Sequence, residues 1–293
     1  MIELTTAERR IIEALAIYRF LTVEQMLRLR IGKHRDTCYK PAHGLSSGNR
    51  PLLRSFIMKP HPSKGRLPNV YSLTEHGADI AAELLMIPRS EVQFIWSTNN
   101  PNFAHYEHTT GLIDIHIAVR TWADANNHLV AMFDSRLNFT GGNRRKPGEP
   151  ALAIKTKIPL TGQASLIPDS VFMLANRLGK PYLFCVEYQR EPNTAKLINK
   201  IGAYCHAIGT YALHDKFKFT RERDPRVLII TDSASLAREA IKDMRCIDGF
   251  ADYLPLFRFK TLCDFQGDVF GGWYGADVPG TVTAYSPATM PIE

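Results

Sequence analysis

The chain has 293 residues, enough for two domains of roughly 100–200 residues each. It is 45% hydrophobic and 22% charged, as ordinary globular proteins are, and no apolar segment reaches the roughly 18 residues of a transmembrane helix. The first residues, Met1–Glu8, carry acids and no apolar core segment, so we expect no secretory signal there. Five scattered cysteines without a Cys-x-x-Cys pair favour neither disulfides nor a zinc site, and we expect a cytoplasmic protein.

The N-terminal region predicts three short helices. Two capping boxes, Thr5-x-x-Glu8 and Thr22-x-x-Gln25, each open a helix, and a turn at Tyr18–Phe20 separates the two. Two short capped helices joined by a tight turn are typical of the start of a helix-turn-helix. A third helix is expected within Arg35–Leu45, interrupted by Pro41.

Two strands joined by a basic loop are predicted next. The strands are Leu52–Met58 and Val70–Thr74, the loop Lys59–Pro68 is rich in Pro and Gly, and a helix at Ala78–Leu85 follows. This order is typical of a winged helix-turn-helix, whose third helix enters the major groove of DNA while cations of the wing loop contact phosphate. A winged helix used for protein–protein contact or for homodimerisation is the alternative.

The net charge of +7 is concentrated in this same region. Between Arg28 and Arg66 ten basic residues stand against one acid, Asp36, so the segment carries +9 and the rest of the chain sums to −2. A concentrated basic face favours a polyanionic partner, here double-stranded DNA. The residues that we expect to contact DNA are Arg35, Lys40, Arg50, Arg54, Lys64 and Arg66.

A polar, turn-rich run that ends at Asn99–Asn102 predicts a domain boundary, with residues 1–97 as the first domain. Phe103–Asn127 is expected to form one long helix with an apolar stripe that covers a sheet. Residues 98–263 are assigned to the second domain. The Gly- and Pro-rich residues 264–293 are expected to wrap the surface or to be disordered.

The second domain is predicted to be an α/β sheet covered on both sides, so that the whole chain is of the α+β class with a central mixed sheet. A polar insert at Thr140–Pro150 contains Arg144-Arg145-Lys146. The expected strands are Leu129–Phe133, Ala151–Ile158, one that starts near Asp169, one that ends near Glu187, Arg226–Thr231 and Leu254–Thr261. The expected helices are Thr194–His206 and Ser233–Met244.

Two adjacent strands of this sheet each carry a carboxylate where apolar residues are expected. Asp169 follows an apolar run and Pro168, and Glu187 directly follows the apolar run Tyr182–Val186. A lone buried carboxylate costs several kcal/mol unless it is paired or bound to a metal. Two that converge are suited to a hard divalent cation, Mg²⁺ or Mn²⁺. The alternatives are that Asp169 is a turn residue and that Glu187 faces solvent or forms a structural ion pair with Lys200.

Pro-Asp on one strand and Glu-x-Gln on the next resemble the core motif of PD-(D/E)XK restriction-endonuclease-like proteins. The resemblance implies that Asp169 and Glu187 hold the metal. In that family a lysine two residues after the glutamate helps to activate water, and here this position is Gln189. The family sometimes supplies the lysine from the following helix, which makes Lys200 or Lys196 the candidate, and some members add an acid from the first helix, which would be Glu107.

Over residues 8–204 the chain resembles the replication-relaxation family of plasmid proteins, which includes relaxases of the mobilisation protein C type. The matching stretches include Ile12–Ala16, Tyr18–Thr22, Tyr71–Thr74 and Gly77-Ala78 in the first domain, and Pro168-Asp169, Val186-Glu187, Thr194, Lys200-Ile201 and Tyr204 in the second. The resemblance implies action on plasmid or other mobile-element DNA, either in control of replication or as a metal-dependent nickase at a transfer origin.

Three other interpretations stay open. The chain is a non-enzymatic DNA-binding regulator of replication or transcription if its nuclease-like domain is degenerate, which Gln189 favours. A tyrosine nucleophile, Tyr188 or Tyr204, is a second alternative. A scaffold whose winged helix contacts protein is a third.

Overall fold

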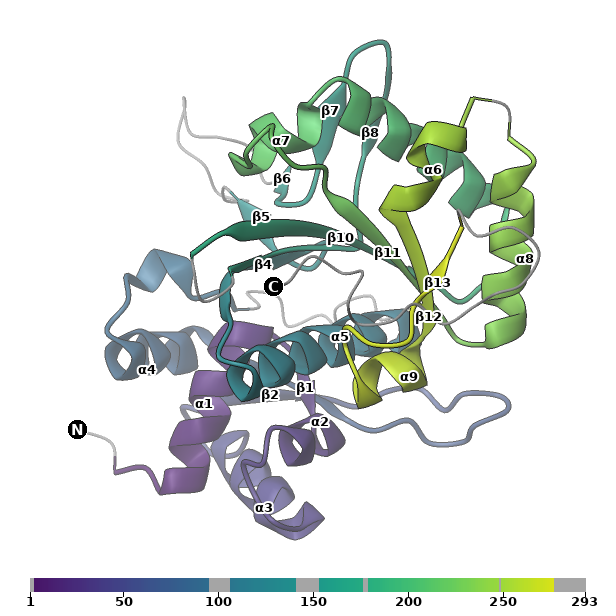
Figure 1. Ribbon diagram of the computed structural model, residues 1–293. Helices are drawn as coiled ribbons and strands as arrows, with labels where there is room; N and C mark the ends of the chain where they lie inside the picture. Colours follow the sequence, from purple (N-terminus) through teal and green to yellow (C-terminus); the bar gives the residue numbers. More distant parts are fainter. Residues whose placement is uncertain (1–2, 95–105, 141–152, 176–178, 248, 277–293) are drawn as a thin grey trace. The chain divides into compact units, whose positions relative to one another are not determined.

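The computed structural model describes residues 3–94, 106–140, 153–175, 179–247 and 249–276 (Figure 1). The chain forms two compact units, Met1–Ile117 (unit 1) and Ala118–Glu293 (unit 2), and helix α5, Tyr106–Ala125, runs across the division. The boundary expected at residues 97 and 98 falls within residues 95–105, outside the described residues. None of the helices that the structure describes is long and apolar enough to cross a bilayer.

The described residues of unit 1 form four α-helices besides the start of α5: α1 Thr6–Tyr18, α2 Val23–Arg28, α3 Arg35–Leu45 and α4 Glu75–Leu85. Both predicted capping boxes are formed, at Thr5 and at Thr22. The predicted interruption of the third helix is wrong, because α3 continues through Pro41. A proline costs one backbone hydrogen bond and introduces steric strain, but Cys38, Ala42 and Leu45 of this helix are buried, and their packing offsets that cost.

A three-stranded antiparallel sheet completes unit 1. Its strands are β1 Leu21–Thr22, β2 Leu53–Phe56 and β3 Val70–Leu73, in the order β1-β3-β2. The sequence predicted β2 and β3 but missed β1, which is only two residues long and runs directly into α2. A short 3₁₀ helix, η1 Arg89–Glu91, follows α4.

Unit 2 is built on a six-stranded mixed sheet, which makes the chain an α+β protein. The strand order is β13-β12-β11-β10-β9-β4, with β10, β11 and β12 parallel and the other pairs antiparallel. The strands are β4 Leu129–Ser135, β9 Ser170–Ala175, β10 Pro181–Gln189, β11 Arg226–Thr231, β12 Phe257–Thr261 and β13 Tyr274–Gly275.

The two faces of this sheet have different cores. Helices α6 Ala195–Gly209, α7 Ala212–Phe217 and α8 Ala234–Arg245 contribute to the core of one face, to which Cys185 and Ile229 also belong (Figure 1). On the other face aromatic rings stack: Phe172 lies 5.7 Å from Phe133 and 4.8 Å from Phe184, between ring centroids. Successive residues of a strand point to opposite faces of the sheet, so the odd-numbered residues of β9 and β10 point toward α6, α7 and α8.

The strand predicted at Ala151–Ile158 is replaced by shorter pieces. Ala153–Ile154 form β6, which pairs with β5 Phe139–Thr140, and Ile158–Leu160 form β7, which pairs with β8 Gln163–Leu166. A turn at residues 155–157 separates β6 from β7, because the backbone N–H of Lys157 donates to the carbonyl of Ile154. The insert that contains Arg144, Arg145 and Lys146 lies outside the described residues, apart from Thr140 in β5.

Residues 264–276, expected to begin a tail, belong to the folded unit. After the 3₁₀ helix η2 Ala251–Leu256, β12 leads into helix α9 Leu262–Gly267, and β13 then pairs with β12. Lys260, only 2% exposed, donates hydrogen bonds to the backbone carbonyls of Asp268 and Gly271, and its ammonium lies 5.5 Å from the ring centre of the buried Trp273. The prediction of a tail rested on the Gly and Pro content of this segment, which gives no information about these contacts of Lys260. Residues 277–293 are outside the described part of the chain.

Candidate functional site

The structure brings Asp169 and Glu187 together on the face of the unit 2 sheet that packs against α6, α7 and α8. Strands β9 and β10 are antiparallel, and Ser170 pairs with Val186. One step further along both strands places Asp169 directly opposite Glu187. Directly opposed residues of an antiparallel pair point to the same face. The sequence predicted two adjacent strands that each carry a carboxylate. The register of β9 against β10 is what brings the two carboxylates together.

Both carboxylates are buried, each residue being 4% exposed. The backbone N–H of Tyr188 donates to Asp169 Oδ2 at 3.0 Å, and Arg136 Nη1 lies 3.4 Å from Asp169 Oδ1. Arg136 follows β4, and its own backbone N–H donates to the carbonyl of Asp169 at 2.9 Å. Asp169 is therefore fixed by backbone hydrogen bonds as well as by charge.

Helix α6 adds a cation and a phenol to the pair. Lys200 Nζ forms an ion pair with Glu187 Oε2 and lies 3.8 Å from Asp169 Oδ1. Tyr204, one helical turn later and fully buried, donates its hydroxyl to Glu187 Oε1 at 2.5 Å. Residues four apart lie on the same face of a helix, so this one face of α6 covers both oxygens of Glu187.

The electrostatics of this cluster are set by burial and by Lys200. Burial raises the pKa of Glu187 to about 8, although the charge of Lys200 opposes that rise. For Lys200, burial acts to lower the pKa, but the two carboxylates outweigh it and the pKa is raised. Burial, together with the neighbouring Glu187, raises the pKa of Tyr204 well above its ordinary value. The cluster therefore keeps a cationic lysine beside a carboxyl group that can change protonation near neutral pH.

The donor set suits a hard divalent cation in part. Asp169 and Glu187 both direct carboxylate oxygens at one cationic atom, Lys200 Nζ, and Mg²⁺ is commonly bound by one or two carboxylates together with water and substrate phosphates. No group of three or more His, Cys, Asp or Glu side chains that could hold a metal ion occurs in the described part of the chain. A metal at this position would need water and phosphate as further ligands, and Lys200 would have to move aside.

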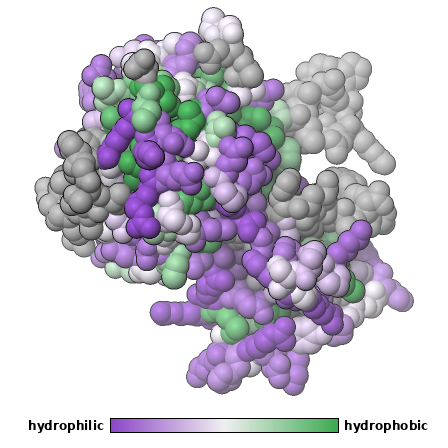
Figure 2. All heavy atoms as spheres, turned by 90° about the vertical axis from the view of Figure 1, so that its right-hand side faces the viewer, coloured by the Kyte–Doolittle hydropathy of each residue, from purple (hydrophilic) through white to green (hydrophobic). Residues whose placement is uncertain are grey.

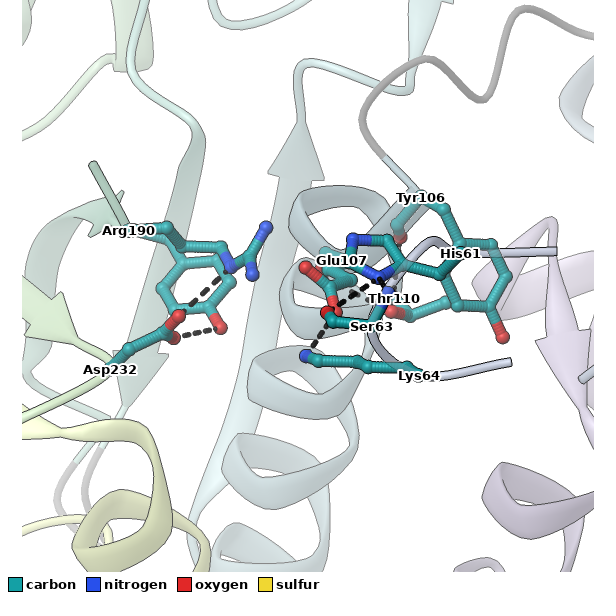
Figure 3. A network of polar contacts seen from close by, with 9 residues as sticks. His61, Ser63, Lys64, Tyr106, Glu107, Thr110, Arg190 and Asp232 are labelled. Atoms are coloured by element: carbon teal, nitrogen blue, oxygen red, sulfur yellow. Dashed lines mark hydrogen bonds and ion pairs between the residues drawn. The ribbon is translucent and has the colours of Figure 1, made fainter. Parts of the chain in front are cut away.

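The other residues proposed for this site lie elsewhere. Gln189 uses its amide to donate to the carbonyls of Glu191 and Asn193, at 2.7 and 3.2 Å, and so holds the turn after β10. Lys196 is exposed and pairs with Glu191 at 3.1 Å. Glu107 is a residue of unit 1, where it forms an ion pair with Lys64 (Figure 3). Of the two lysines considered, Lys200 is the one at the carboxylates.

Two contributors to the cluster were missed as such. The sequence indicates Tyr204 as part of the family resemblance and as a candidate nucleophile but not as a partner of Glu187, although its spacing of four from Lys200 places both on one helical face. No local pattern in the sequence indicated Arg136, because the pairing of β4 with β9 is what brings it to Asp169.

A second polar cluster involves the other face of β10. Tyr188 donates its hydroxyl to Asp232 Oδ1 at 2.5 Å, and Arg190 Nε lies 3.0 Å from Asp232 Oδ2; Figure 3 shows Arg190 directed at Asp232. Burial, with the charge of Asp232, raises the pKa of Tyr188. Both candidate tyrosine nucleophiles are thus buried phenols that donate to a carboxylate, and a raised pKa disfavours the phenolate that attack requires.

The six basic residues expected to contact DNA are distributed over three parts of unit 1. Arg35 and Lys40 are exposed on α3, Arg50 and Arg54 lie before and on β2, and Lys64 and Arg66 are exposed between β2 and β3. Arg35 pairs with Glu24 at 3.4 Å. Hydrophilic side chains make up much of the surface turned to the viewer in Figure 2.

No protein-family model, no curated protein and no solved structure matches the chain. A function for the chain is therefore inferred from its residues and their geometry alone.

Proposed function

We propose that the chain is a sequence-specific DNA-binding protein of the replication-relaxation type, with a winged helix-turn-helix in unit 1 and a PD-(D/E)XK nuclease-like domain in unit 2 that nicks DNA with Mg²⁺ or Mn²⁺. The observation that carries the proposal is the convergence of Asp169 and Glu187 on Lys200 Nζ, from two adjacent strands and the following helix. Two carboxylates can hold a divalent cation, which stabilises charge on a phosphate, and a lysine beside them can add its own positive charge.

Each residue of the cluster has a distinct part in this chemistry. A divalent cation bound by Asp169 and Glu187 would supply Lewis-acid stabilisation of the charge on the phosphate. Lys200, once released from the carboxylates, brings its positive charge to the phosphate oxygens. Tyr204 and the backbone N–H of Tyr188 hold the two carboxylates in place.

Unit 1 supplies the target recognition in this proposal. The order of α1, α2, α3 and the β2–β3 hairpin supports a winged helix, and exposed cations lie on α3 and between the two strands. Helix α3 would enter the major groove while the loop between β2 and β3 follows the phosphate backbone. The +9 charge of residues 28–66, a range that contains α3 and most of this loop, supports a polyanionic partner for them.

The test is nicking of supercoiled plasmid by the full chain in Mg²⁺ or Mn²⁺. We expect Asp169→Asn and Glu187→Gln to abolish nicking and to leave duplex binding nearly unchanged. Asp232→Asn is the matched control, since it removes a carboxylate of the second cluster, and it should nick at the normal rate. Equal nicking by all three variants would refute the role of the Asp169–Glu187 pair.

A DNA-binding regulator without nuclease activity is the second candidate. It is favoured by Gln189, which stands where the family has a lysine and is used to hold a turn, and by the engagement of both carboxylates with Lys200. Calorimetry with Mn²⁺ distinguishes the two. The nuclease requires Mn²⁺ binding that Asp169→Asn removes and that strengthens from pH 7 to pH 8.5 as Glu187 loses its proton. If the chain is instead a regulator without nuclease activity, calorimetry should detect no Mn²⁺ binding that depends on Asp169.

A further inference from the structure

A hollow in unit 1 lies among helices α2 and α3 and the segment that leads into β3. It has a volume of about 350 Å³, and its polar lining includes Glu24, Arg35, Tyr39 and Arg66. Pockets for small organic ligands usually have volumes of roughly 300–1,000 Å³. The hollow therefore has room for a molecule larger than a single ion.

Two guanidinium groups make this hollow suitable for a phosphate. Arg35 and Arg66 both line it and both are exposed. The fork of an arginine matches phosphate oxygens in a bidentate way. Arg35 is held by Glu24 only at 3.4 Å, through an ion pair whose two side chains are 63% and 41% exposed. Such a long, solvated pair is weak, so Arg35 can turn to a phosphate at little cost.

Glu24 gives the hollow a hydrogen-bond acceptor that is not fully used. Its Oε1 accepts from Arg35, whereas its Oε2 is buried and has no hydrogen-bond partner within the described residues. An ionised carboxylate only accepts hydrogen bonds, and a buried acceptor without a donor is unfavourable. A ligand with two adjacent N–H donors would satisfy both oxygens once the carboxylate turns to bring Oε2 into the hollow.

Among the four DNA bases, guanine presents such a pair. Its N1–H and its 2-amino group lie side by side on the edge remote from the sugar. Adenine and cytosine place one amino group beside an acceptor nitrogen, and the N–H of thymine is flanked by two carbonyl oxygens. Because a carboxylate repels these acceptors, Glu24 should select guanine over the other three bases.

The wall beside Glu24 is ordered by aromatic contacts. Tyr39 is 36% exposed, its ring stacks on His43 with centroids 5.7 Å apart, and the guanidinium of Arg35 lies 5.9 Å from its ring centre. These three residues are spaced by four along α3 and share one face of it. A base entering the hollow would meet a ring whose orientation the stack on His43 maintains when Arg35 turns to the phosphate.

We propose that this hollow binds a guanine nucleotide, with the base on Glu24 and the phosphate on Arg35 and Arg66. The nucleotide is either free or an unpaired guanosine of a DNA strand. The second source rests on the proposed DNA-binding function, and the first is independent of it.

The test is binding of nucleotides to the full chain, measured by calorimetry with dGMP, dAMP, dCMP and dTMP. We expect dGMP to bind roughly tenfold or more tightly than the others, the discrimination that a good bidentate contact provides. Glu24→Gln should remove that preference. Arg66→Ala should weaken binding of dGMP but not of deoxyguanosine, which lacks the phosphate. Lys33→Ala, an exposed cation of the same segment that does not line the hollow, is the matched control, and circular dichroism verifies that each variant is folded.

A thymidine oligonucleotide with one guanine distinguishes the two sources. Tighter binding of this strand than of dGMP identifies the nucleotide as part of DNA, and equal binding identifies a free nucleotide; both support the site. Binding without preference among the four bases, or no nucleotide binding, overturns the inference. If duplex DNA still binds in that case, the proposed function stands alone. Guanine binding without duplex binding would instead support the nucleotide site and refute the proposed recognition of duplex DNA.

Discussion

Lys200 decides whether the buried carboxylates of unit 2 are tolerated. It is the cation that pairs with Glu187, and it also lies within 4 Å of Asp169, at 3.8 Å. Removing one partner of a buried ion pair leaves an uncompensated charge in a medium of low polarity. This dependence gives a stability test that does not require activity.

We expect Lys200→Met to lower the free energy of unfolding by about 3 kcal/mol at pH 9, above the pKa of Glu187, where this carboxylate is ionised and would lose its cation. Lys196→Met is the matched control on the same helix, because the Lys196–Glu191 pair is exposed, and its effect should stay within about 0.5 kcal/mol. Urea unfolding followed by circular dichroism measures both. A Lys200 variant as stable as the control would show that the carboxylates do not depend on this lysine.

Glu187 makes the stability of the protein depend on pH. Its pKa rises from 4.5 to about 8 on folding, so between these values the folded state keeps a proton that the unfolded state has released. Stability should therefore be full below pH 4.5 as far as this group is concerned, and should fall as pH rises toward 8, by at most roughly 1.4 kcal/mol per pH unit. Unfolding measured at pH 5.5 and pH 7.5 should show a smaller difference for Glu187→Gln than for the natural chain. An unchanged difference would contradict the raised pKa.

At the scale of elements, helix α4 is held against the start of β2 by a glycine. A Cβ at Gly77 would lie 1.9 Å from the carbonyl oxygen of Leu52, which already accepts a hydrogen bond from the backbone N–H of Thr74 at 3.0 Å. Neither backbone can move without breaking this contact. A Cβ at Gly44, in α3, would meet nothing within 4 Å.

We therefore expect opposite effects of the same substitution. Gly77→Ala should destabilise the protein by about 2 kcal/mol, since overpacking outweighs helix propensity. Gly44→Ala should stabilise it by roughly 0.5 kcal/mol, because alanine is the better helix former. Thermal unfolding of the two variants provides the measurement. A stabilising Gly77→Ala would mean that α4 does not pack this closely on Leu52.

Local signals in the sequence predicted most of these elements, and non-local contacts account for the rest. The capping residues Thr5 and Thr22 marked two helix starts, and the apolar run Arg226–Thr231 has the bounds of β11. The two-residue β1 exists only because β3 lies beside it, and β13 only because β12 does. Periodicity within a segment carries no record of such partners.

The same division applies to the candidate site. Asp169 and Glu187 were recognisable as acids in apolar surroundings, and Lys200 as a cation on the next helix. The contact of Arg136 with Asp169 depends on how β4 pairs with β9, and the engagement of Gln189 depends on the path of the turn that follows β10. Neither leaves a mark in the sequence near those residues.

At the scale of the whole molecule, charge is divided unevenly along the chain. Residues 28–66 carry +9, and the remaining residues together carry −2. If DNA binds through this segment, the salt dependence of the affinity should arise from it. Each phosphate contact contributes about 0.9 to the slope of log affinity against log salt concentration.

We expect Lys40→Ala and Arg54→Ala each to reduce that slope by about 1, whereas Lys216→Ala, which removes an exposed cation of unit 2, should leave it unchanged. Fluorescence anisotropy with labelled duplex DNA at several salt concentrations gives the slopes. Slopes for the Lys40 and Arg54 variants equal to that of the Lys216 variant would show that neither Lys40 nor Arg54 contacts a phosphate.

The contacts of α6 with Asp169 and Glu187 have a consequence for local unfolding of unit 2. If α6 swung away, Lys200 and Tyr204 would leave with it, and Glu187 would lose the groups that occupy both its oxygens. The hairpin of β9 and β10 and the helix after it should thus open as one cooperative piece. Amide hydrogens in the hairpin and in α6 would then exchange with solvent deuterium at a common rate, rather than the helix fraying first.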